Sequence, residues 1–230
     1  MGEKGESIMK KICFVTTVYM TYKCFLKQLS QYLYESGEYD ISLICNNEEG
    51  ALKDIPSFVH YHPVDMKRGV SLSAFGAIKK IGEILEREKF DIVQYSTPNA
   101  AFYASIAAKK KKVPVRLYCQ WGIRYMGFEG WKRSVFKHLE KKTCDNSTFI
   151  EAESHNIRNF SLDEKLYNAD RSCVIWNGSA SGVDLNKFDI SRKNCWREKI
   201  RKQYENTLFK NTIYKSILSL VNIVIPIIIG

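Results

Sequence analysis

The chain has 230 residues, of which 45% are hydrophobic and 26% are charged, and its mean hydropathy is -0.28. This composition is that of an ordinary globular protein and excludes collagen-like, low-complexity and wholly disordered chains, and the length suits one large domain or one domain with appendages. Lys and Arg number 35 against 25 Asp and Glu, a formal net charge of +10 that favours an anionic partner.

Short β-rich runs alternate along the chain with amphipathic helical runs. Residues 1–8 are predicted to be a disordered N-terminus, and this charged start lacks the apolar stretch of a signal peptide. The expected strands are Lys11–Val18, Tyr39–Cys45, Ser57–Val64, Asp91–Ser96, Val113–Trp121, Thr148–Glu153 and Cys173–Trp176. The expected helices are Phe25–Gly37, Ser71–Lys89, Asn99–Lys112, Trp131–Lys142 and Ser154–Leu166.

This alternation of strands and helices indicates βαβ units and a parallel sheet covered on both faces. The predicted fold class is α/β, a Rossmann-like doubly wound parallel sheet spanning residues 9–190. In such a sheet ligands bind at the carboxyl ends of the strands. The candidate ligand-binding loops are therefore Thr16–Lys23, Ser96–Asn99, Gln120–Trp131, Glu153–Asn156 and Asn177–Asp184.

The loop after the first strand, Thr16–Lys23, contains no glycine. A dinucleotide-binding unit needs glycines there so that the backbone can approach a pyrophosphate, so NAD and FAD are disfavoured. The phosphate-binding pattern GxxxxGK[ST] is also absent, which excludes a P-loop NTPase. Thr16, Thr17, Tyr19 and Lys23 are candidates to hold a hydroxylated, phosphorylated ligand, and the alternative is a solvated loop.

The loop after the fifth strand combines aromatic, amide and guanidinium groups in the sequence YCQWGIRYMG. Such groups suit the recognition of sugars and phosphates. Trp121 and Arg124 are therefore candidate ligand-binding residues. The alternative is that Trp121 packs under the edge of the sheet.

The expected helix Trp131–Lys142 lies in a strongly basic part of the chain, since residues 105–145 hold 11 basic and 3 acidic side chains. Its apolar stripe is flanked by cations, which suits an interfacial helix on an anionic membrane. The candidate membrane-surface residues are Trp131, Lys132, Arg133, Phe136 and Lys137. The alternative is an ordinary packed helix with a solvated basic back.

The C-terminal part departs from the alternating pattern. Gly178, Gly182 and Asp184 lie in a flexible turn that is either a hinge between domains or a surface loop. Residues 191–206 are expected to form a charged helical linker. Residues 207–230 form an apolar tail, which is too short and too interrupted to span a bilayer unaided and is a candidate product of an altered reading frame.

The cysteines and histidines indicate neither disulfides nor metal. The chain has seven cysteines, an odd number, and no CxxC pair, which indicates a reducing, cytosolic compartment. His60 and His62 alternate on an expected strand without a third ligand nearby, so no metal is expected. The chain lacks RNP, helix-turn-helix and zinc motifs, so no nucleic-acid partner is expected.

Three segments together resemble the N-terminal, acceptor-binding domain of a family 4 glycosyltransferase of the GT-B fold, of the bacterial capsule and O-antigen type. They are KKICFVTTV at the start, FDIVQYSTPNAAFYASIAAKKKKVPVRLYCQWGIRY in the middle, and GSASGVDLNKF, which resembles the family's interdomain linker. The resemblance covers about residues 9–203. It implies a retaining hexosyltransferase that moves a sugar from a nucleotide sugar to a glycan or lipid-linked acceptor.

Carried over by position, the resemblance places Thr17 and Tyr19 in a loop facing donor phosphate and acceptor. Trp121 stands where many relatives have a histidine before glycine, and Arg124 follows in the same loop. Glu153 and Ser154 end the sixth strand near the interdomain cleft.

The sequence departs from the family in two ways. The first-strand loop lacks the usual glycines, and the donor motif of two glutamates separated by seven residues has no counterpart. The resemblance thus implies a truncated or split enzyme, inactive alone, whose nucleotide sugar binds mainly to a separate C-terminal donor domain, with no other cofactor. The expected location is cytoplasmic, at the inner face of the membrane. The alternative functions are a non-catalytic membrane- or glycan-binding module and an inactive fragment.

Overall fold

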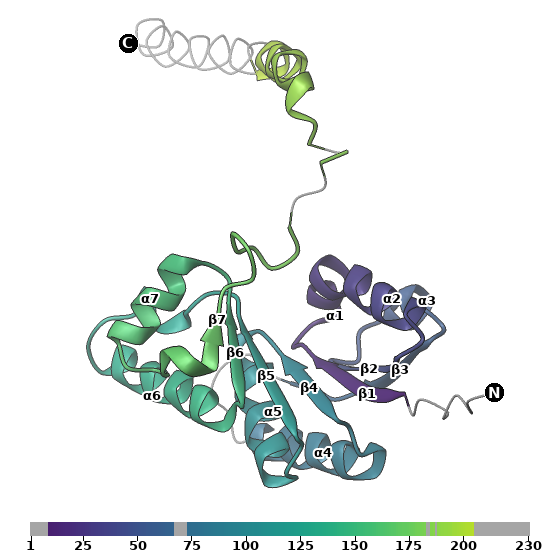
Figure 1. The fold of residues 1–230 in the computed structure, drawn as a ribbon, viewed down its shortest axis with the longest axis vertical. Coiled ribbons are helices and arrows are strands. Elements are labelled where there is room, and N and C mark those ends of the chain that lie inside the picture. The colour runs from purple at the N-terminus through teal and green to yellow at the C-terminus, as the bar shows by residue number, and fades with distance from the viewer. Residues whose placement is uncertain (1–8, 67–72, 183–184, 187, 205–230) are drawn as a thin grey trace, which may run out of the picture. The chain divides into compact units, whose positions relative to one another are not determined.

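The computed structural model describes residues 9–66, 73–182, 185–186 and 188–204 (Figure 1). The chain divides into two compact units, Met1–Ser181 and Gly182–Gly230. In the second unit the described residues form the turn η4 (Ile190–Arg192) and a helix over 193–204. The predicted N-terminus 1–8, the tail 207–230 and Asp184 lie outside the described residues, and the domain boundaries predicted at 190 and 206 stay predictions.

The first unit is built on a sheet of parallel strands, as predicted. The strands are β1 (Lys10–Val15), β2 (Tyr39–Cys45), β3 (Val59–Pro63), β4 (Ile92–Tyr95), β5 (Val115–Gln120), β6 (Phe149–Ala152) and β7 (Ser172–Cys173). Their order is β3-β2-β1-β4-β5-β6-β7, and every neighbouring pair is parallel. The direction of progression therefore reverses between β1 and β4, which makes this the ligand-binding position of a doubly wound sheet.

Helices and helical turns connect the strands. They are α1 (Tyr19–Thr21), the π-helical turn η1 (Tyr22–Leu26), α2 (Lys27–Glu35), α3 (Ala51–Asp54), α4 (Ser73–Glu88), α5 (Pro98–Lys110), η2 (Arg124–Gly127), α6 (Gly130–Asn146), α7 (His155–Asp163) and η3 (Ala169–Arg171). The N-terminal boundary of the first predicted helix is wrong, because the helical segment begins at Tyr19 rather than Phe25. Tyr19, Tyr22 and Leu26 are buried at helical spacing against the sheet, and this burial extends the helix into the expected loop.

One face of the sheet carries the main core. Tyr95 of β4 and Tyr118 of β5 stack on this face with ring centroids 6.0 Å apart. Ile81 of α4, Ala104 of α5 and Cys144 of α6 are fully buried in the same cluster. Adjacent helices among these are in contact, so α4, α5 and α6 form one layer that holds their N-termini near the carboxyl ends of the strands.

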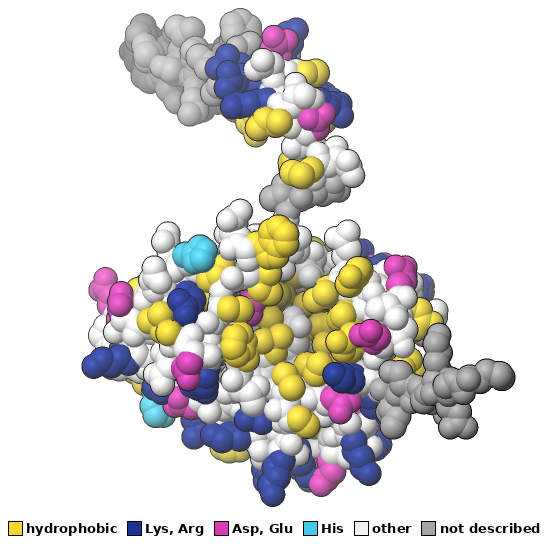
Figure 2. All heavy atoms as spheres, viewed as in Figure 1, with side chains coloured by type: hydrophobic (Ala, Val, Ile, Leu, Met, Phe, Trp, Pro, Cys, Tyr) yellow, Lys and Arg dark blue, Asp and Glu magenta, His cyan; other side chains and the backbone are white. Residues whose placement is uncertain are grey.

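The other face is only partly covered within the described residues. The segment from α1 to α2 packs over β1–β3, where Phe14 and Leu43 are fully buried. Farther along, Val115 of β5 and Phe149 of β6 stay 41% and 36% exposed. Figure 2 shows hydrophobic side chains gathered across the middle of the first unit, over the strands β4–β6 of Figure 1. We call this half, with Val115, Leu117 and Phe149, the open sheet face.

Two further differences from the expected elements concern short segments. The helix α3 was not predicted; it begins after Gly50, whose φ of 86° is readily adopted only by glycine. The last strand was predicted to reach Trp176 but ends at Cys173. Ile175 and Trp176 are 57% and 90% exposed, so no burial holds them in the sheet. Among the described residues, no helix has the length and apolar character needed to cross a bilayer.

Candidate functional site

Three loops meet at the carboxyl ends of β1, β4 and β5. They supply Thr17, Thr97 and Arg124, which line a pocket of about 280 Å³. An adjoining pocket of about 320 Å³ shares Thr97 and Arg124 and adds Trp121. We call these two adjoining pockets the strand-end site. It lies where the strand order reverses, as the doubly wound topology requires of a ligand site.

Thr97 links the β1 and β4 loops. The Thr17 amide donates to Thr97 Oγ1 at 3.2 Å, and the two threonine hydroxyl oxygens lie 3.0 Å apart. Thr97 adopts φ +64° and ψ 136°, a conformation that is costly for a β-branched residue. Thr97 immediately precedes α5, and the surrounding contacts keep it in this strained conformation. Backbone strain of this kind is concentrated at functional sites.

Arg124 provides the positive charge of the strand-end site. Its Nη1 donates to Asn99 Oδ1 at 3.1 Å, and its guanidinium carbon lies 4.6 Å from the centre of the Phe136 ring. Asn99 belongs to the first turn of α5, where backbone amides and the helix dipole favour an anion. The arrangement therefore suits a ligand that carries hydroxyl groups and a phosphate.

A buried polar network lies behind this site. Tyr118 and Gln120 donate hydrogen bonds to Glu140 Oε1 at 2.9 and 2.8 Å. The other end of the Gln120 amide accepts from Ser161 and Tyr167 at 3.1 and 2.9 Å. Burial raises the pKa of Glu140, and the two hydrogen bonds partly oppose that rise. The network joins β5 to α6 and α7 and so supports the loop that carries Arg124.

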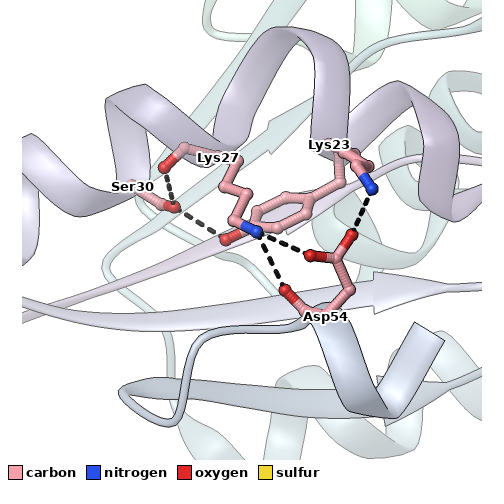
Figure 3. Close-up of polar contacts among 5 residues, drawn as sticks. Lys23, Lys27, Ser30 and Asp54 are labelled. Carbon is pink, nitrogen blue, oxygen red and sulfur yellow. Dashed lines mark hydrogen bonds and ion pairs between the residues drawn. The ribbon is translucent and has the colours of Figure 1, made fainter. Parts of the chain in front are cut away.

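Tyr19 and Lys23 do not line the strand-end site. Tyr19 is buried in the core, and its amide donates to Glu48 Oε1 at 2.9 Å. Lys23 forms an ion pair of 2.6 Å with Asp54 (Figure 3). Lys27 reaches the same carboxylate at 2.9 Å, and the hydrogen bonds from the two lysines lower the pKa of Asp54. This cluster ties α3 to the first helical segment.

Trp121 lines a pocket and also packs against Phe25 with ring centroids 5.2 Å apart, so its ligand-binding role stays a prediction. Glu153 and Ser154 have local structural contacts instead. The Ser154 hydroxyl accepts from the Ile157 amide at 3.3 Å and caps α7. The Glu153 carbonyl accepts from the Ser179 amide at 2.7 Å. Neither residue lines the strand-end site.

Gly178 lies against the end of β6, in the first unit, whereas Gly182 begins the second. The φ of Gly178 is +88°, and a Cβ at Gly178 would lie 2.3 Å from the Glu153 carbonyl oxygen. The chain can make this turn only without a side chain. Gly37 offers a matched comparison, since its φ is +72° but a Cβ there would meet nothing within 4 Å.

We expect Gly178→Ala to lower the free energy of unfolding by about 2 kcal/mol, because backbone strain and overpacking add. Gly37→Ala carries only the strain and should cost about 1 kcal/mol. Urea denaturation followed by circular dichroism measures both changes. Equal losses in the two variants would show that the contact with Glu153 contributes nothing.

The five candidate membrane-surface residues of α6 fall into two groups. Trp131 is 73% exposed, with Lys132 beside its ring, at the start of the helix. Arg133 and Lys137 pair with Glu164, at 3.3 and 2.5 Å. Phe136 stacks on Phe128, at 4.7 Å between ring centroids, and carries Arg124 on its face. Trp131 and Lys132 are thus the two that project into solvent.

Sequence reasoning pointed to the loop 96–99 but selected no residue within it. The structure adds Thr97 and Asn99 to the site. The neighbouring Ser96 lines neither pocket, and its hydroxyl is buried without a hydrogen-bond partner among the described residues. The signal present in the sequence was the run STPN, in which a proline at the first helical position marks a helix N-terminus directly after a strand.

Comparison with known proteins defines the class to which this fold and site belong. Residues 11–154 match the profile of the glycosyl transferase 4-like family, and the chain belongs to that family. It is 28% identical over 153 residues to the capsular polysaccharide biosynthesis glycosyltransferase CapM of Staphylococcus aureus. That match covers 66% of this chain and 39% of the relative, so the chain spans well under half the relative's length.

Solved structures share the fold at low sequence identity. A UDP-N-acetylglucosamine 2-epimerase from Rickettsia bellii superposes with a TM-score of 0.56 at 20% identity, over 75% of this chain and 45% of that one. The Neisseria meningitidis epimerase bound to UDP-GlcNAc gives 0.56 at 18%, over 84% and 52%. Anabaena HepE, solved with UDP and glucose, gives 0.55 at 14%, over 77% and 46%. These likenesses confirm the Rossmann-like α/β fold.

Proposed function

We propose that the chain is the acceptor-binding half of a retaining hexosyltransferase that transfers a sugar from a nucleotide sugar to a lipid-linked glycan during surface-polysaccharide synthesis. The observation that carries this proposal is the strand-end site, where Thr17, Thr97 and Arg124 converge in a chain of the glycosyl transferase 4-like family. The likeness to a capsular glycosyltransferase supports the choice of pathway.

The chemistry of the site fits a phosphorylated sugar. Arg124 and the N-terminus of α5 together attract a phosphate, and the threonine hydroxyls can exchange hydrogen bonds with sugar hydroxyls. Much of the rate in a two-substrate transfer comes from holding donor and acceptor in contact. We therefore expect binding of the acceptor head group by this chain, with little turnover in the absence of a donor-binding half.

A separate C-terminal donor domain is the partner that we propose, and it would hold the nucleotide sugar. Membership of the family supports this proposal, because a glycosyltransferase needs a donor as well as an acceptor. No cofactor besides the nucleotide sugar and no nucleic-acid partner is proposed.

The experiment has a binding arm and a transfer arm. Calorimetric titration of the full chain should show that a hexose 1-phosphate binds and that the free hexose does not. If neither sugar binds at millimolar concentration, the proposed site is wrong. Mass-spectrometric transfer assays should show no product with the chain alone. Turnover by the isolated chain would contradict the proposal that this chain binds only the acceptor.

We also propose that the chain acts in the cytoplasm at the inner face of an anionic membrane, through Trp131 and Lys132. We expect Lys132→Glu to weaken co-sedimentation with phosphatidylserine vesicles about fivefold or more, since one cation near such a surface contributes about 1 kcal/mol. Lys53→Glu, which reverses the charge of another exposed lysine, on α3, is the control. Equal binding by the two variants, or binding insensitive to salt, would contradict the proposed surface.

A further inference from the structure

A second, apolar cavity adjoins the strand-end site. It is partly open, has a volume of about 70 Å³, lies between α4, α5 and α6, and shares Pro98, Asn99 and Arg124 with the strand-end site. Its remaining lining is largely apolar: Ala74, Phe102, Tyr103, Phe136, Leu139, Glu140 and Thr143. Arg124, stacked on Phe136, thus lies between a pocket that is lined by threonine side chains and a cavity that is lined by Phe102, Phe136 and Leu139.

The size and lining of this cavity restrict what it can hold. A volume of about 70 Å³ has room for about five water-sized groups, but apolar walls offer such waters few partners. Unfilled apolar space lowers stability. Ligand sites combine a mostly apolar lining with a few placed polar groups, and here Arg124 and Asn99 supply such groups beside the apolar side chains. Glu140 is the one carboxylate in the lining, and its Oε1 already accepts from Tyr118 and Gln120.

We propose that this cavity binds the first few carbons of the apolar chain of a lipid-linked acceptor, while the phosphate of the same molecule lies at Arg124 and the start of α5. This inference rests on the proposed function. It adds a chain-binding subsite to the strand-end site, which we also call the head-group site because it would bind the sugar phosphate of the acceptor. The position of Arg124 carries it, because one side chain touches both pockets and would lie at the junction between phosphate and chain. Recognition would then depend on the lipid itself and not only on the sugar.

The test compares inorganic pyrophosphate with farnesyl diphosphate, below its micelle concentration, by calorimetric titration of the full chain. We expect farnesyl diphosphate to bind at least tenfold more tightly. Methyl NMR should show shifts of Leu139 with farnesyl diphosphate but not with pyrophosphate. Equal affinities, or tighter binding that leaves Leu139 unshifted, would overturn the inference while leaving the head-group site intact. Failure of both diphosphates and of hexose 1-phosphate to bind would remove the proposed function as well.

Variants sharpen the comparison. Leu139→Phe fills the cavity and should abolish the advantage of farnesyl diphosphate while leaving pyrophosphate binding unchanged. Leu29→Phe makes the same change on the exposed face of α2 and should keep the advantage. Thermal unfolding of each variant establishes that it is folded. Thr143→Met, one turn farther along α6 in the same lining, provides a second filling variant. Persistence of the advantage in a folded, filled variant would overturn the proposal.

Discussion

Replacing Arg124 by alanine is expected to weaken the affinity for a hexose 1-phosphate about 30-fold. A hydrogen bond to a charged group contributes about 1.5–3 kcal/mol, and each 1.4 kcal/mol is a tenfold change in affinity. Arg124→Lys should recover only part of the loss, because an ammonium group provides charge without the planar fork that also bonds Asn99 and stacks on Phe136. Titration calorimetry measures all three affinities.

Arg87→Ala is the matched control for this experiment. Arg87 is in the last turn of α4, pairs with Glu88 and lines neither pocket of the strand-end site. Its loss should leave the affinity within twofold of the original. If Arg124→Ala binds the sugar phosphate as tightly as the original chain, Arg124 does not bind the phosphate and the head-group site must be placed elsewhere.

Replacing Glu140 by alanine is expected to lower the free energy of unfolding by about 3 kcal/mol. The variant would leave the Tyr118 hydroxyl and the Gln120 amide without their acceptor in a buried environment, and an unsatisfied buried group costs about 1–3 kcal/mol. Glu140→Gln keeps the shape and an acceptor oxygen and should cost less than half as much. Urea denaturation at pH 7 measures both, and equal losses would show that hydrogen bonding contributes little.

The same carboxyl is expected to make stability depend on pH. Burial raises the pKa of Glu140 in the folded state, so between the unfolded and folded pKa values the folded chain holds the proton more often. The contribution of this group to stability is therefore greatest below the unfolded pKa and falls as pH rises through the folded pKa. Glu140→Gln should remove this part of the pH dependence, and a urea midpoint series from pH 4 to pH 8 detects it.

Some features of the strand-end site were predictable from the sequence and others were not. Trp121 and Arg124 were identified because aromatic, amide and guanidinium groups follow an apolar strand, and both line the site. Lys23 was selected because it lies in the loop expected after the first strand, but the helix begins earlier than the pattern indicated and presents the ammonium group to Asp54. From sequence alone, Tyr19 and Tyr22 were interpreted as part of a polar loop, because the sheet that buries them is evident only in the structure.

The sequence by itself determined the chain order of the strands and the longer helices, and the parallel α/β sheet, because the periodicity of buried apolar residues is a local property that the chain carries along its length. The family was indicated by the resemblance of three sequence segments and was confirmed by the family match. Only the tertiary structure decided which loops share one site. Thr17 and Thr97 are 80 residues apart, and their contact depends on β1 and β4 pairing in register. Likewise, the apolar cavity exists because α4, α5 and α6 pack with a gap between them, and packing gaps depend on the three-dimensional fit of side chains that no local pattern records.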